Sequence, residues 1–211
     1  MKDLLFSQRS VMHELGNALA VMSGYMDIFA ETAMSAEQQE LAGKIYTAFG
    51  LIQKIIENAH HVAPISINAF LENTVSACAV FVSSKRISLN VISELGHDEF
   101  LVEEHKLSQI FINLIKNAAK HTDKGGIIVS VQRRIDLLEF CVSDTGCGIP
   151  PEYMPHIFSP FVRAHTNQQG SGLGLSICRT LVESMGGQIW GESKPGHGSK
   201  FYFVIPAVSK E

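Results

Sequence analysis

Two asparagines in the second half of the chain have the spacing and chemistry of a phosphate and metal site. Asn113 and Asn117 stand four residues apart in a stretch with a helical pattern, so their amides share one helix face. An asparagine carbonyl is a hard oxygen ligand suited to Mg²⁺, and its NH₂ group can donate to a phosphate. Such a pair on its own is more often a surface feature, and it needs support from other residues.

Two glycine-rich segments supply that support. Residues 144–148 read DTGCG after a predicted strand, where glycine lets the backbone approach a ligand closely and an aspartate can accept a hydrogen bond from a ring amine. Residues 170–175 read GSGLGL before a predicted helix, whose exposed N-terminal amides suit a polyphosphate. No strand leads directly into residues 170–175 and no βαβ unit follows, which argues against a dinucleotide-binding fold.

The order of these signals is far more specific than any one of them. The segments NLIKNAAKH, DTGCGIP, IFSPF and GSGLGL follow one another between residues 113 and 175. They resemble the N box, the first glycine box, the F box and the second glycine box of the ATP-binding domain of sensor histidine kinases. This is the ATPase fold shared with DNA gyrase and heat-shock chaperones, and the resemblance covers about residues 65–206.

The resemblance implies ATP and Mg²⁺ as cofactors. It implies Asp144 on the adenine amine, Asn113 and Asn117 at Mg²⁺ and phosphate, and a mobile lid over residues 154–169. The full set of nucleotide-binding residues that it implies is Asn113, Asn117, Lys120, His121, Asp144, Gly146, Gly148, Arg163, Gly170, Gly172, Leu173 and Gly174.

One of the nine histidines has a setting that suits phosphorylation. His13 lies two residues past Val11 on an apolar helical seam, which places it on the outward face, with Glu14 adjacent and Asn17 one turn later. A solvent-facing imidazole can attack a γ-phosphate through one ring nitrogen while a carboxylate takes or orients the proton on the other. The pattern makes His13 a candidate phosphoryl acceptor.

The surrounding segment MHELGNALAVM resembles the H box of the dimerisation and phosphotransfer domain of these kinases. That resemblance implies His13 as acceptor, Glu14 as general base, and Asn17 at the position that holds an attacking water for dephosphorylating the partner regulator. Gly16 and Ala18 depart from the usual polar residue and proline. A helix without that proline is straighter, which weakens the phosphatase role of Asn17 more than the acceptor role of His13.

The elements that must position these residues fall into two domains, 1–63 and 64–211. Apolar residues in the first sixty positions repeat every 3.5 residues in two stretches, which predicts a helical hairpin. Pairing with a second copy would complete a dimeric four-helix bundle, although packing of the hairpin on its own chain stays open. After Pro64 strand and helix patterns interleave, which predicts an α+β chain whose second domain is an α/β sandwich of the Bergerat type.

Within residues 64–211 the pattern predicts a mixed sheet with helices on one side. Helices are expected from an N-cap at Asn68 to about Ser83, over 104–121, and to about Met185. The expected strands are 65–67, 87–92, 100–102, 127–134, 137–143, 188–192 and 200–205.

Composition narrows the classes of function. The chain has 211 residues, of which 45% are hydrophobic and 18% charged, so global disorder is excluded. A net charge of −4 offers no basic surface for nucleic acid, and no stretch approaches the ~20 apolar residues of a membrane span. Four cysteines without a CxxC pair predict reduced thiols in a cytoplasmic protein.

These observations predict the catalytic core of a histidine kinase, a homodimer through the hairpin. It would use Mg-ATP to phosphorylate His13 and then pass the phosphoryl group to an aspartate of a response-regulator receiver domain. Two alternatives stay open: a phosphotransfer scaffold with a vestigial ATP domain, and an ATP-gated interaction protein or serine kinase of the same fold.

Overall fold

The computed structural model describes residues 62–83, 85–162 and 172–208, together with the isolated positions Gln38 and Ile45. Both isolated residues are helical and exposed, but the predicted hairpin and its dimer otherwise lie outside the described residues. The site candidates His13, Glu14, Asn17, Arg163 and Gly170 also lie outside them.

The described part of the chain alternates strands and helices. In chain order the elements are β1 (Ala63–Ser66), α3 (Ile67–Cys78), the 3₁₀ turn η1 (Ala79–Phe81), β2 (Ile87–Ser93), β3 (Glu99–Val102), α4 (Glu104–His121), β4 (Gly125–Arg134), β5 (Leu137–Asp144), the 3₁₀ turn η2 (Met154–His156), α5 (Gly174–Ser184), β6 (Gln188–Lys194) and β7 (Gly198–Pro206).

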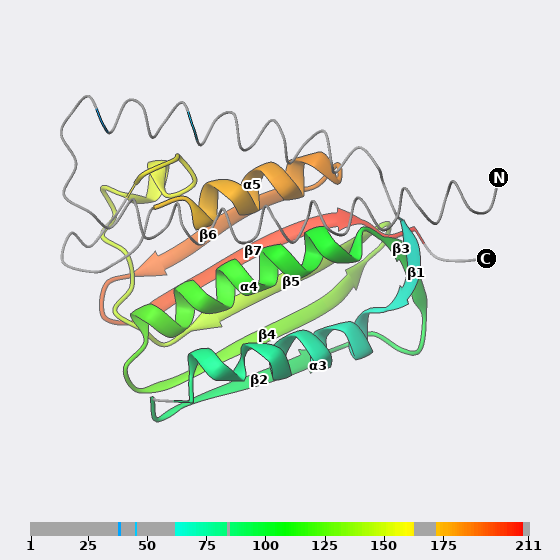
Figure 1. Ribbon diagram of the computed structural model, residues 1–211, viewed down its shortest axis with the longest axis horizontal. Coiled ribbons are helices and arrows are strands. Elements are labelled where there is room, and N and C mark those ends of the chain that lie inside the picture. Colours follow the sequence, from blue (N-terminus) through cyan, green and yellow to red (C-terminus); the bar gives the residue numbers. More distant parts are fainter. Residues whose placement is uncertain (1–37, 39–44, 46–61, 84, 163–171, 209–211) are drawn as a thin grey trace. The chain divides into compact units, whose positions relative to one another are not determined.

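Five of the strands form one mixed sheet in the order β2-β4-β5-β7-β6. Only β2 and β4 are parallel, with Ile87 opposite Gly125, whereas the other neighbours are antiparallel. β1 and β3 form a separate antiparallel pair. Helices α3, α4 and α5 lie together over one face of the sheet (Figure 1). The predicted α/β sandwich with helices on one side is confirmed.

An aromatic cluster forms the centre of the core, between α4 and the sheet. Phe140 of β5 and Phe203 of β7 stack with ring centroids 4.8 Å apart, and Phe111 of α4 packs edge-on against them at 5.6 and 5.5 Å. All three side chains are fully buried. Because side chains alternate along β5, its even-numbered residues enter this core while the odd-numbered ones face outward.

The start of α3 differs from the expectation. Ser66, not Asn68, is the N-cap, and its side chain accepts a hydrogen bond from the Ala69 amide at 3.5 Å. The Asn68 amide instead donates to the carbonyl oxygens of Leu95 and Gly96 at 3.2 and 2.9 Å, so a contact with a distant loop uses the side chain. The α-helix also ends earlier than predicted, at Cys78, and continues as the turn η1.

A buried ion pair joins α4 to α5 at the start of α4. The Lys106 ammonium lies 3.0 Å from the Glu103 carboxylate and donates to the Ser184 hydroxyl at 3.0 Å. The two charged side chains are only 1% and 9% exposed. Since Ser184 is the last residue of α5, this contact fixes the two helices relative to each other.

Candidate nucleotide site

The C-terminal half of α4 carries four of the predicted site residues: Asn113, Asn117, Lys120 and His121. The helix buries a stripe that includes Leu114 and Ala118 against the sheet, while both asparagines are only half-buried. The Nδ2 atom of Asn113 is buried and donates to no oxygen or nitrogen in the part of the chain that the structure describes, where the Cys178 sulfur is its neighbouring acceptor. Because sulfur is only a weak acceptor, this buried amide can donate to a stronger one, such as a phosphate oxygen.

The first residue of α5 lies against Asn113. A Cβ built on Gly174 would be 4.0 Å from the Cβ of Asn113, with nothing else nearer. The C-terminal end of the second glycine segment therefore faces the asparagine helix directly. An amide donor from α4 and the N-terminal amides of an eleven-residue helix meet at this point, which suits a phosphate chain.

Asp144 ends β5 as a buried carboxylate with only 6% of its surface exposed. One of its oxygens, Oδ1, accepts the Gly146 amide at 2.8 Å. Burial raises the pKa of this carboxyl, and hydrogen bonds from the backbone of Gly146 and Ser199 partly offset that rise. The orientation of the carboxylate is thereby fixed, as hydrogen bonding to a ring amine requires.

The first glycine segment is packed against the end of α4. A side chain on Gly146 would place its Cβ 2.3 Å from the His121 carbonyl oxygen and 2.8 Å from Asp144 Oδ1, so only glycine fits. The Cys147 amide donates to that same His121 oxygen at 3.1 Å. Gly148 has a φ of +69° and lies against the Lys194 carbonyl, which also excludes a side chain. These contacts fix the first glycine segment against the C-terminal end of α4.

The second glycine segment is held through Phe161. The Gly172 carbonyl accepts the Phe161 amide at 3.0 Å, and Phe161 is 47% exposed with a left-handed φ of 63°. Leu173 caps α5, and its carbonyl oxygen accepts the Ile177 amide at 2.9 Å. Because the Leu173 side chain is buried, only its backbone is available to a nucleotide.

Phe158, the other aromatic residue of the IFSPF segment, is a packing residue. Its ring meets Phe201 of β7 edge-on at 6.3 Å, and the neighbouring Ile157 is buried. This end of the segment is anchored on the sheet, which leaves Phe161 as its exposed aromatic side chain.

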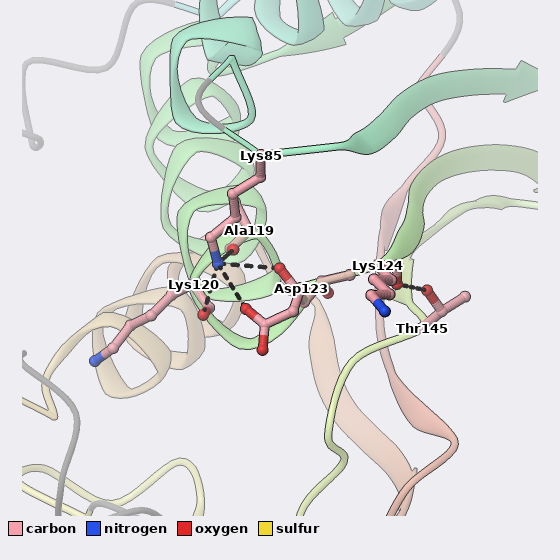
Figure 2. Close-up of polar contacts among 7 residues, drawn as sticks. Lys85, Ala119, Lys120, Asp123, Lys124 and Thr145 are labelled. Atoms are coloured by element: carbon pink, nitrogen blue, oxygen red, sulfur yellow. Dashed lines mark hydrogen bonds and ion pairs between the residues drawn. The ribbon is translucent and has the colours of Figure 1, made fainter.

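Sequence reasoning missed Lys85, which lies just before β2. Its ammonium donates to the carbonyl oxygens of Ala119, Lys120 and Thr122 at 2.7, 3.2 and 3.0 Å (Figure 2). Nothing local in the sequence marks this contact, because the parallel pairing of β2 with β4 brings the lysine to the helix end. Figure 2 also shows the Thr145 hydroxyl donating to the Lys124 carbonyl, at 3.1 Å, which ties the first glycine segment to the α4–β4 loop.

All four cysteines are free, so the structure contains no disulfide at any of them. Burial raises the pKa of Cys178 to about 12, and the adjacent Asn113 amide, which stabilises the thiolate, offsets part of that rise. No cluster of three or more His, Cys, Asp or Glu side chains suited to a metal occurs among the described residues.

The fold and the placement of these groups define the class of protein. A mixed sheet covered on one face by three helices, with a site between α4, the loop after β5 and the start of α5, is a Bergerat-type ATP-binding domain. Residues 102–209 match the family model of the histidine kinase-, DNA gyrase B- and HSP90-like ATPases, and the chain belongs to this family.

Curated relatives extend the match to sensor kinases. The chain is 30% identical to the phytochrome-like protein Cph1 of Synechocystis sp. over 92% of its own length and 28% of that protein. It is also 30% identical to the sensor histidine kinase RcsC of Escherichia coli, over 93% of its own length and 23% of that protein. The chain thus spans about a quarter of the length of these relatives. The resemblance to sensor histidine kinases is confirmed.

Solved structures agree with this assignment. The catalytic domain of histidine kinase ThkA superimposes with a TM-score of 0.63 at 28% identity, covering 71% of this chain and 97% of that one. Full-length ShkA in complex with AMPPNP shares the fold, with a TM-score of 0.66 over 97% of this chain and 46% of that one. No described helix combines the length and the apolar character that crossing a bilayer requires.

Proposed function

We propose that this chain is the catalytic core of a histidine kinase, which uses Mg-ATP to phosphorylate His13. The observation that carries the proposal is the convergence of three sequence-distant groups: the Asn113 amide, the Asp144 loop and the first turn of α5. Each offers what one part of ATP needs, namely donors for phosphate and a fixed acceptor for the adenine amine. The AMPPNP complex of ShkA, a protein of the same fold, agrees with this choice of ligand.

The proposed roles follow from the chemistry of each group. The Asp144 carboxylate accepts the adenine amine, and the α5 amides and the Asn113 NH₂ donate to phosphate oxygens. Asn113 and Asn117 would hold Mg²⁺ through their carbonyl oxygens, and the bound ion would supply positive charge beside the phosphates. The phosphate side is completed by Lys120, His121, Arg163 and the backbone of Gly170, Gly172 and Leu173. Gly146 and Gly148 let the backbone approach the nucleotide beside Asp144.

The phosphoryl transfer itself needs a nucleophile in line with the γ-phosphate. A neutral ring nitrogen of His13 attacks the phosphorus, the bond to the bridging oxygen breaks, and ADP leaves with that oxygen. Glu14 accepts the proton from the other ring nitrogen. The phosphoryl group then passes to a carboxylate oxygen of an aspartate on a response-regulator receiver domain, which restores the imidazole. The homodimer through residues 1–63 would bring His13 and an ATP-binding domain together.

Incubation of the chain with Mg²⁺ and γ-labelled ATP tests this proposal. We expect label on the protein that acid removes and alkali does not, and that is lost in His13→Ala while ATP binding is retained. Label that persists in His13→Ala would place the acceptor elsewhere, and acid-stable label would favour a serine kinase of the same fold.

A second measurement separates the kinase from a phosphotransfer scaffold with a vestigial ATP domain. Calorimetric titration with Mg-AMPPNP should show binding that Asn117→Ala removes. A wild-type chain that binds no nucleotide would contradict the kinase proposal and favour the scaffold. Nucleotide binding without phosphorylation of any residue would favour an ATP-gated interaction protein.

A further inference from the structure

The last turn of α4 ends against a single ammonium group. Lys85 Nζ donates to three backbone carbonyls of residues 119, 120 and 122, and lies 3.5 Å from the Asp123 carboxylate. Figure 2 shows the lysine reaching the helix end from a neighbouring segment, while the Lys120 side chain points away from it. One side chain from 34 residues upstream thus satisfies carbonyls on both sides of His121.

This contact replaces the usual way of ending a helix. The final carbonyls of a helix have no partner within it, and they carry the negative end of the helix dipole. α4 has no glycine cap, because Thr122 is extended at φ −110° and ψ 123° and the chain turns directly toward β4. An ammonium with three donors suits this cluster of oxygens in number and in charge.

The position of the last turn of α4 affects two parts of the candidate nucleotide site, Asn117 and the first glycine segment. His121, between the bonded carbonyls, accepts the Cys147 amide at 3.1 Å and packs against Gly146 without room for a Cβ. Asn117 lies one turn earlier on the same helix. A shift of the last turn would therefore move the asparagine and the first glycine segment relative to each other.

We propose that Lys85 is a positioning residue for nucleotide binding, whose ammonium fixes the end of α4 so that Asn117 and the loop after Asp144 hold one nucleotide between them. This inference rests on the proposed ATP-binding function. Lys85 itself need not touch the nucleotide, and its effect passes through the carbonyls of α4 and the His121–Cys147 hydrogen bond.

The test compares dissociation constants for Mg-AMPPNP in the full chain. Lys85→Met removes the charge at nearly constant length, and we expect it to weaken binding about tenfold, since small displacements of binding groups are costly. Lys85→Arg, which retains a cation and several donors, should recover most of the affinity. Amide hydrogen exchange of Cys147 should quicken in Lys85→Met and not in Lys85→Arg.

Two control variants separate positioning from other effects. Asp123→Ala removes a side chain that is 93% exposed and leaves the carbonyl contacts intact, so its dissociation constant should stay within about twofold of wild type. Val131→Ala deletes buried methyl groups in β4 beyond its midpoint, which lowers stability without touching the last turn of α4.

The possible outcomes are distinct. A wild-type chain that binds no nucleotide contradicts the proposed function. A wild type that binds, with Lys85→Met binding equally well, overturns the role of Lys85. If Val131→Ala loses as much affinity for Mg-AMPPNP as Lys85→Met, the effect is general destabilisation and the proposal is wrong. If Lys85→Arg binds Mg-AMPPNP as weakly as Lys85→Met, the charge of Lys85 has no role.

Discussion

Replacing Lys106 by methionine should destabilise the ATP-binding domain much more than an ordinary surface substitution. The Lys106 ammonium and the Glu103 carboxylate are 3.0 Å apart and almost wholly buried. At an effective dielectric constant of 20 their attraction is about 5.5 kcal/mol, and burial protects it from screening by solvent. Lys106→Met leaves the Glu103 carboxylate without that partner and the Ser184 hydroxyl without its donor.

The loss of stability in Lys106→Met has an upper limit because the buried Glu103 carboxyl can take up a proton instead of staying charged. Keeping a glutamate protonated at pH 7 costs about 3.7 kcal/mol, worked from its ordinary pKa of 4.3. We therefore expect Lys106→Met to lower the free energy of unfolding by about 3 kcal/mol at pH 7. The loss should shrink by about 1.4 kcal/mol for each pH unit down to about pH 4.5, because the unfolded chain then also binds the proton.

Urea unfolding followed by tryptophan fluorescence measures this loss. Trp190 is the only tryptophan in the chain and stacks on Tyr202 in the sheet, with ring centroids 5.4 Å apart. Arg179→Met is the matched control, since the Arg179–Glu183 pair is shorter, at 2.7 Å, yet both side chains are 56% exposed. Arg179→Met should lower the free energy of unfolding by no more than about 0.5 kcal/mol.

The double variant Glu103→Leu/Lys106→Met should recover most of the stability, because the core then contains neither of the two charges. A loss of under about 1 kcal/mol in Lys106→Met at pH 7, or a loss independent of pH, would refute the reasoning from burial.

Three further predictions follow from the site and the strands. Because burial raises the pKa of Asp144, its charged form costs stability above that raised pKa and costs nothing below the ordinary value of 3.8. Asp144→Asn should therefore raise the melting temperature at pH 7 but not at pH 3, and should weaken ATP binding; calorimetry at both pH values measures this. Ile135 is β-branched, 88% exposed and left-handed at φ 50°, which strains its backbone. Ile135→Asn should therefore raise the free energy of unfolding in urea by about 1 kcal/mol, and a decrease would contradict the strain. Cys147 is exposed in the first glycine segment whereas Cys178 is buried, so iodoacetamide at pH 8 should alkylate Cys147 first; peptide mass spectrometry should show that Mg-AMPPNP slows this reaction, and equal rates would place the nucleotide elsewhere.

Local sequence signals predicted most of the elements of the described domain. α4 was expected over its observed range because its apolar period is strong and a glycine pair follows it. The hairpin of β4 and β5 was expected from alternation, to within two residues of its observed bounds. The candidate site residues could be named from the sequence because its glycines and asparagines occur in ordered segments with a family resemblance, and their roles in nucleotide binding stay predictions.

Contacts between distant segments could not be predicted in the same way. The cap of α3 came from Ser66 because Asn68 bonds to a loop 27 residues away. Lys85 and Lys106 read as ordinary charged residues, and only the tertiary structure shows that one caps α4 and the other is buried. The roles of His13, Glu14 and Asn17, the hairpin and the domain boundary stay predictions.

The parallel pairing of β2 with β4 has a consequence for the order in which the domain opens. β2 is an edge strand with β4 as its one partner in the sheet, and all of β3 and α4 lies between them in sequence. Closing so long a loop is entropically costly, so β2 should detach before the central strands β5 and β7, and its amides should exchange with solvent sooner. Since Lys85 lies two residues before the start of β2, each detachment of this edge strand would also release the end of α4 and, by the role proposed for Lys85, weaken nucleotide binding.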